Sequence, residues 1–129
     1  MPLDMISIET FMQHYGKALV TGDASEISAC FAIPALVLHD GGANAVRNRN
    51  EMVAAFRGIA EGYRRQGLSQ MLATVNRAAV ISAELTEIDV TWAGIRVDGS
   101  ATGHREQYRY LLRDTGNGPM IQVVINLPS

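Results

Sequence analysis

The sequence predicts an α+β fold in which one curved antiparallel sheet carries helices on its concave side. Apolar residues recur at helical spacing through the first half of the chain, and from Met71 onward the period changes to two. Two turn signals, VDGS at 97–100 and DTGNG at 114–118, separate the last strands. Because helices come first and strands last, the pattern favours segregated layers over alternating βαβ units.

The first helix is predicted from an apolar stripe near the N-terminus. Its members fall within an arc of about 100° on a helical wheel: Ile8, Phe11, Met12, Tyr15 and Leu19. Ser7 or Asp4 can cap the start, and Gly22 offers a left-handed stop. Tyr15 lies near the middle of the stripe, so we expect its ring to be buried.

A second, shorter helix and a strand follow. Asp23 and Glu26 form a capping-box pattern, with Ile27, Cys30 and Phe31 on the apolar side of the helix. Pro34 prevents the helix from continuing. The segment ALVLHD, residues 35–40, then predicts a short buried strand that ends before two glycines.

The third helix is predicted from a second capping box, Asn48 and Glu51. Its inner face carries Met52, Phe56, Ile59 and Tyr63, and Gly67 ends it. Beyond it the alternating pattern predicts strands near 71–84, 86–97, 104–113 and 120–127. The turn signals between them indicate that the last three strands form an antiparallel meander.

Composition narrows the class of protein. With 129 residues the chain fits a single domain, 1–129, and 47% hydrophobic residues suit a folded globule. A formal net charge of −2 gives no electrostatic signature of a nucleic-acid or lipid partner. The N-terminus lacks a secretory pattern and no apolar run would span a membrane, so we expect a cytoplasmic protein. The single cysteine and scattered histidines predict no metal site and no cofactor.

The stretch YGKALVTGDASEISACFA, together with this order of elements, resembles the nuclear transport factor 2-like superfamily. The matching features are a first-helix aromatic followed by Ala-Leu, then Gly22-Asp23, then Phe31-Ala32 before the first strand. The relatives include ketosteroid isomerase-like proteins, SnoaL-like polyketide cyclases and scytalone dehydratase-like enzymes. The resemblance implies a cone-shaped α+β barrel, whose curved antiparallel sheet encloses a pocket with three N-terminal helices.

The resemblance also implies a catalytic set. Ketosteroid isomerase-like enzymes use a first-helix tyrosine and a protonated late-strand acid as an oxyanion hole, with an aspartate at the end of the first strand as the base. Tyr15 matches the tyrosine and Glu106 the late-strand acid. The base position falls on His39, with Asp40 one place later. An aromatic lining that binds substrate would comprise Phe56, Tyr63, Trp92, Tyr108 and Tyr110.

The strand period supports Glu106 independently. Glu106, Tyr108, Tyr110 and Leu112 share one face of the predicted 104–113 strand, and the opposite face is wetter. Glu106 is therefore expected to point inward, where burial favours its neutral form. The alternative is that Glu106 pairs with an arginine of a neighbouring strand.

The other candidates have structural interpretations too. Tyr15 is equally consistent with a core tyrosine, His39 with a hydrogen-bonded histidine at a strand end, and Asp40 with a turn residue. His39 and Asp40 take opposite faces of a regular strand, so only one of them is expected to face the pocket.

Two functions remain open at this point. The first is proton transfer, as isomerisation, cyclisation or dehydration, on a small apolar carbonyl compound. The second is a non-catalytic module of the same fold that binds a ligand or only dimerises. A homodimer through the sheet is expected in either case, because the outer face of a large sheet usually needs covering.

Overall fold

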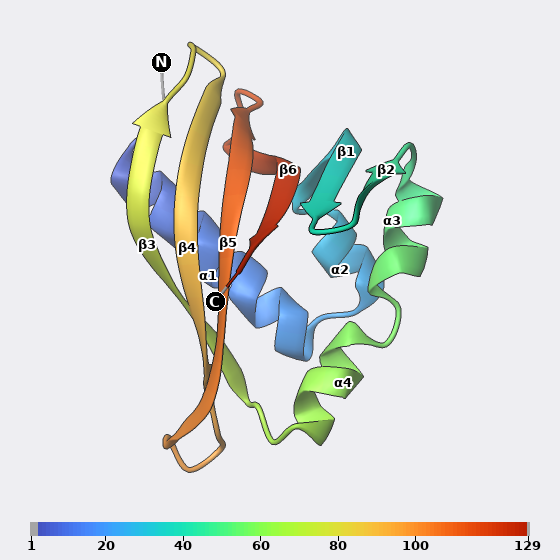
Figure 1. The fold of residues 1–129 in the computed structure, drawn as a ribbon, viewed down its shortest axis with the longest axis vertical. Helices are drawn as coiled ribbons and strands as arrows, with labels where there is room; N and C mark the ends of the chain where they lie inside the picture. The colour runs from blue at the N-terminus through green and yellow to red at the C-terminus, as the bar shows by residue number, and fades with distance from the viewer. Residues whose placement is uncertain (1–2, 129) are drawn as a thin grey trace.

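The computed structural model describes residues 3–128. Along the chain, its helices come before most of its strands (Figure 1). The elements, in chain order, are α1 Met5–Thr21, α2 Ala24–Ser28, β1 Phe31–His39, β2 Gly42–Val46, α3 Arg49–Phe56, α4 Ile59–Arg65, β3 Gln70–Val80, β4 Leu85–Ile95, β5 Ala101–Asp114 and β6 Pro119–Leu127. The predicted α+β class is confirmed. No helix within residues 3–128 has both the length and the apolar character needed to cross a membrane.

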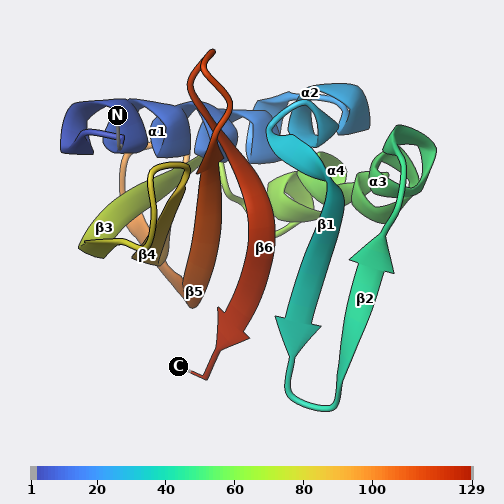
Figure 2. The same cartoon turned by 90° about the horizontal axis from the view of Figure 1, so that it is seen from above.

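The sheet is curved and open, and α1 lies across one of its faces (Figure 2). Its strand order is β2-β1-β6-β5-β4-β3. Neighbouring strands are antiparallel except for β1 and β6, which pair in parallel with Val37 opposite Val124. The sequence did not indicate this pair, because a turn signal reports only on strands that follow one another. The meander of β4, β5 and β6 is confirmed.

The start of α1 decides between the two predicted N-caps, and its end contradicts the predicted left-handed conformation of Gly22. Asp4 is the N-cap, since its carboxylate accepts a hydrogen bond from the Ser7 amide at 2.7 Å. Gly22 is not left-handed: its φ and ψ are −85° and 167°. A Cβ at Gly22 would lie 2.8 Å from the Ala18 carbonyl oxygen, so close packing explains a glycine there.

The region between α1 and α3 differs from the prediction. Asp23 and Asn48 are the N-caps of α2 and α3, since their side chains accept hydrogen bonds from the amides of Glu26 and Glu51, whereas the Glu51 carboxylate accepts from the Arg47 amide rather than completing a capping box. However, α2 ends at Ser28 and β1 already begins at Phe31, so Pro34 lies inside the strand. The hairpin partner β2 was not predicted, because its sequence GANAV shows no apolar alternation.

The predicted third helix is two helices. Arg57 has an extended backbone and Gly58 a φ of +84°, which ends α3 and starts α4 in a new direction. The Arg64 guanidinium of α4 donates to the Val20 carbonyl at 2.9 Å and so joins α4 to the C-terminal turn of α1. This break lets α3 lie against β2 while α4 stays against α1.

The outer face of β3, β4 and β5 carries a charged network. Asp89 accepts hydrogen bonds from Arg109 at 2.7 Å and from Arg77 at 3.0 Å, and Glu87 pairs with both arginines. The hydrogen bonds from Arg109, then those from Arg77, hold the pKa of Asp89 at about 2, against an ordinary value of 3.8.

This network predicts a pH dependence of stability. A carboxyl whose pKa is lower in the folded state stabilises the fold above its unfolded pKa, and that contribution is lost as pH falls toward 2. We expect Asp89→Asn to lower the urea midpoint at neutral pH and to match the wild type more closely as pH falls below about 4. Urea unfolding is followed by circular dichroism at each pH. If Asp89→Asn lowers the urea midpoint by the same amount at every pH, the carboxylate charge is not responsible for the difference.

Candidate functional site

A cavity of about 200 Å³ lies between α1, α4 and the concave face of the sheet. Every strand of the sheet except β2 contributes to it, as do α1, α3 and α4. Its lining residues are Tyr15, Leu19, Val37, Phe56, Ile59, Tyr63, Met71, Trp92, Glu106, Tyr108, Tyr110 and Val124. Glu106 is the only charged residue in this set, and half of the set is aromatic. The cavity is therefore an apolar space with one carboxyl group.

Tyr15 is held at the cavity by the packing of α1 on the sheet. Its ring meets Phe31, Trp92 and Tyr110 edge-on, with centroids 5.8, 5.9 and 6.3 Å away. The next residue, Gly16, allows the close approach. A Cβ there would lie 2.6 Å from the Met71 carbonyl oxygen and 2.7 Å from Cζ3 of Trp92.

The Tyr15 hydroxyl is a protonated donor. Burial, and after it the neighbouring Tyr110 phenol, raises the pKa of Tyr15 well above its ordinary value of 10. The side chain is 4% exposed. Its hydroxyl makes no hydrogen bond to another group of the described residues. A buried phenol of this kind is available to a bound molecule.

Glu106 is bound by two tyrosines. The Tyr63 hydroxyl donates to Oε2 at 3.4 Å, and the Tyr108 hydroxyl donates to Oε1 at 3.2 Å. Burial, then the charge of Glu106, raises the pKa of both phenols, that of Tyr108 to about 12, so both remain protonated. Glu106 points inward, as its place on the strand predicted. Both of its oxygens accept hydrogen bonds, whereas the hypothesis from the sequence made it a neutral donor.

Trp92 and Tyr110 form a buried pair on β4 and β5. The indole Nε1–H donates to the Tyr110 hydroxyl oxygen at 2.8 Å. The two side chains are 1% and 2% exposed. Burial raises the pKa of Tyr110 well above 10, and the Trp92 hydrogen bond acts in the opposite direction.

His39 and Asp40 do not join this site. Both are exposed, and they line a separate surface pocket with Asn126, Leu127 and Pro128. The cause is the length of β1: Val37 lines the cavity, while His39 is the last residue of the strand and Asp40 lies in the turn to β2. The His39 ring Nδ1 lies 3.0 Å from the Asp40 carbonyl oxygen. The structure thus brings Tyr15 and Glu106 together and leaves the two base candidates outside.

The predicted lining residues do line the cavity. These are Phe56, Tyr63, Trp92, Tyr108 and Tyr110. Five further residues line the cavity that were not predicted to do so, although most of them fall on predicted buried faces. They are Met71 and the aliphatic residues Leu19, Val37, Ile59 and Val124. Cys30 is buried outside the cavity, and burial raises its thiol pKa to about 11, which leaves it a packing residue.

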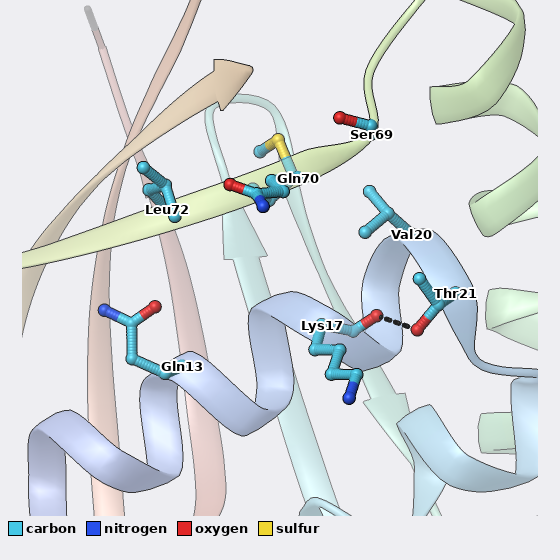
Figure 3. Close-up of a pocket in the computed structure, with 8 residues that line it drawn as sticks. Gln13, Lys17, Val20, Thr21, Ser69, Gln70 and Leu72 are labelled. Atoms are coloured by element: carbon cyan, nitrogen blue, oxygen red, sulfur yellow. Dashed lines mark hydrogen bonds between the residues drawn. The ribbon is translucent and has the colours of Figure 1, made fainter. Parts of the chain in front are cut away.

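A second hollow lies on the surface between α1 and β3 (Figure 3). It has a volume of about 310 Å³, and its polar residues include Gln13, Lys17 and Gln70. Its described lining residues include neither a carboxyl group nor a histidine, so they offer no proton acceptor for catalysis near neutral pH. Among the side chains that the structure describes, no three or more potential metal ligands gather.

The fold and its aromatic cavity define an NTF2-like protein. The chain belongs to the family described as NTF2-like protein (DUF6841), whose model matches residues 4–129. No curated protein matches the sequence.

Solved structures share the fold at low sequence identity. A domain of unknown function with a cystatin-like fold from Nostoc punctiforme is 16% identical, with a TM-score of 0.70, over 98% of this chain and 77% of the other. An NTF-2 like protein of unknown function from Shewanella oneidensis is 13% identical, with a TM-score of 0.69, over 95% and 98% of the two chains. A ketosteroid isomerase-like protein from Erwinia carotovora atroseptica is 14% identical, with a TM-score of 0.64, over 100% of both chains.

Proposed function

We propose that the cavity binds a small monocyclic carbonyl compound and transfers a proton on it. The observation that carries this proposal is the presence of one available phenol, Tyr15, and one carboxyl, Glu106, in the same apolar cavity. Likeness in fold to a ketosteroid isomerase-like protein is consistent with this chemistry.

The volume of the cavity sets the size of the ligand. At about 200 Å³ it lies below the roughly 300–1,000 Å³ that is usual for drug-sized ligands. A cavity of about 150 Å³ is enough for benzene. We therefore propose a single-ring substrate rather than a multi-ring steroid or polyketide skeleton.

The reaction follows from the two polar groups. Glu106 removes a proton from the carbon next to the substrate carbonyl, and the electron pair of that C–H bond forms an enolate. Tyr15 donates a hydrogen bond to the oxygen on which negative charge develops. Glu106 then returns the proton to another carbon of the conjugated enolate, so the net change is an isomerisation without an oxidant or co-reactant. Tyr63 and Tyr108 position the carboxyl through their hydrogen bonds.

The test uses the β,γ-unsaturated cyclohexenone, whose conversion to the conjugated isomer is followed by ultraviolet absorbance. The wild type is expected to be stabilised against heating by this ketone and to isomerise it. Tyr15→Phe removes the donor and keeps the ring, so kcat/KM should fall about a hundredfold. Full activity in Tyr15→Phe would contradict the assigned role. Absence of both ligand stabilisation and turnover in the wild type would refute the function.

The second candidate function is ligand binding without turnover. It is favoured by the two phenols that already donate hydrogen bonds to both oxygens of Glu106, because they compete with a substrate proton for those oxygens. Ligand stabilisation of the wild type without isomerisation, and without deuterium uptake next to the carbonyl in heavy water, would establish this alternative.

We also propose that the chain forms a homodimer through the outer face of its sheet. Along β1 and β6 the residues that alternate with the cavity-lining Val37 and Val124 face outward, and they form an apolar strip of Leu36, Leu38, Val123 and Ile125. A two-fold dimer would place this strip against its own copy. Ile125→Lys should yield a monomer in sedimentation velocity, while Thr91→Lys, outside the strip, should not. A wild-type monomer at all concentrations would exclude the dimer.

A further inference from the structure

The hydroxyl of Tyr110 accepts one hydrogen bond, and its own proton is still free to be donated. An indole N–H can only donate, so in the Trp92–Tyr110 pair the Tyr110 oxygen is the acceptor. The Tyr110 hydroxyl proton must therefore point elsewhere. Among the described residues it has no acceptor. Tyr110 lines the cavity, so a ligand oxygen there is a candidate acceptor for that proton.

The neighbouring Tyr15 also has a hydroxyl proton that no described residue accepts. Both side chains are almost completely buried, at 4% and 2% exposure, and their rings are in edge contact. Neither hydroxyl bonds to the other. Burial keeps both phenols protonated. Two phenol hydroxyls of buried side chains, from α1 and β5, thus border the same cavity, and neither has an acceptor among the described residues.

We infer that Tyr110 is a second hydrogen-bond donor to the substrate oxygen, acting with Tyr15, and that Trp92 is the positioning residue that directs its proton. This inference rests on the proposed function, and it assigns the oxyanion-binding role to a pair of tyrosines. Glu106, whose oxygens are engaged by Tyr63 and Tyr108, is left to move the proton.

The ligand class follows from the pair. Two phenol donors that border one cavity favour an oxygen that carries full negative charge over a neutral carbonyl, because hydrogen bonds to charged acceptors are roughly twice as strong. Apolar walls accept a flat ring. The site is therefore matched to the enolate of a cyclic ketone or to a phenolate of the same size.

The test measures binding of para-nitrophenolate, with para-nitrotoluene as a neutral control of nearly the same shape. Binding is measured in the Glu106→Gln background, since an uncharged side chain there represents the base after it has accepted a proton and avoids repelling the anion. Adding Tyr110→Phe should weaken phenolate binding about ten- to a hundredfold, as loss of a hydrogen bond to a charged group does. Adding Tyr15→Phe should do the same. Affinity for para-nitrotoluene should change less than about twofold in either case.

Each outcome has a separate meaning. Phenolate affinity that is unchanged by Tyr110→Phe but lowered by Tyr15→Phe would overturn the inference and leave the proposed function standing. Equal losses for phenolate and nitrotoluene would show that Tyr110 only supports the fold, and would also overturn it. If neither probe binds to the Glu106→Gln protein, the cavity is not a ligand site and the proposed function fails as well.

Two further measurements cover a variant that does not fold and test the positioning role. In protein labelled at tyrosine Cζ, the Tyr110 resonance should move on titration with para-nitrophenolate and stay in place with para-nitrotoluene. An unmoved resonance would refute the inference without any substitution of Tyr110. Trp92→Phe, which keeps a ring and removes the N–H, should lower the preference for phenolate over nitrotoluene several-fold. If the preference for phenolate over nitrotoluene is unchanged, Trp92 does not position the Tyr110 proton.

Discussion

Gly16→Ala is expected to destabilise the fold by roughly 3 kcal/mol or more, which exceeds the usual cost of an added methyl group in a packed core. The added Cβ would stand 2.6 Å from a backbone oxygen of β3 and 2.7 Å from the Trp92 ring. Backbone atoms cannot rotate out of the way, and Trp92 is fully buried. α1 would have to move away from the sheet and carry Tyr15 with it. Urea unfolding followed by circular dichroism measures the loss.

Gly62→Ala is the matched control. Gly62 is also a helical glycine, in α4, but a Cβ there has no neighbouring atom within 4 Å. Alanine is the better helix former, so this variant should gain roughly 0.5–1 kcal/mol. Wild-type stability in Gly16→Ala would mean that α1 does not pack against β3 and β4 as closely as described. The cavity wall that Tyr15 forms would then be in doubt.

Glu106→Gln is expected to reduce isomerisation of the β,γ-unsaturated cyclohexenone at least about a thousandfold. The amide keeps the size of the side chain and removes the only carboxyl group among the described lining residues. Binding of the ketone should persist, because the apolar walls and Tyr15 are unchanged. The expected loss therefore falls on kcat rather than on KM.

His39→Asn and Asp40→Asn are the informative controls for this prediction. Both side chains are exposed and lie outside the cavity, so each variant should keep wild-type turnover. Loss of turnover in either variant, with activity retained in Glu106→Gln, would move the base to the end of β1. The cavity would then have to close over His39 or Asp40 when substrate binds.

Features of the fold that depend on local periodicity could be predicted from the sequence. The α1 stripe, the N-caps Asp23 and Asn48, and the inward face of β5 depend on residues a few positions apart, and each is present. The parallel pairing of β1 with β6 depends on segments about ninety residues apart, and no local signal encodes it. The break at Gly58 was missed because a helix tolerates an isolated glycine in its sequence pattern.

The candidate site, like the fold, could be predicted from the sequence only where it depends on local patterns. Tyr15 and Glu106 follow from two periodic faces and from the resemblance to the superfamily. The hydrogen bond of Tyr63 to Glu106 depends on how α4 sits over the sheet, which follows from the break at Gly58 and from the Arg64 contact with α1. The exclusion of His39 depends on the residue at which β1 ends, and strand ends are poorly marked in sequence. The donor role inferred for Tyr110 requires the position of the Trp92 N–H.

A crystal structure of the Glu106→Gln protein with para-nitrophenolate would show whether the aromatic cavity is the binding site. We expect the ring inside the aromatic cavity, with its charged oxygen about 2.7–3.0 Å from the Tyr15 hydroxyl oxygen and the residue 106 amide near the ring. Density for the ligand in the groove between α1 and β3 (Figure 3), or beside His39 and Asp40, with an empty aromatic cavity, would contradict it.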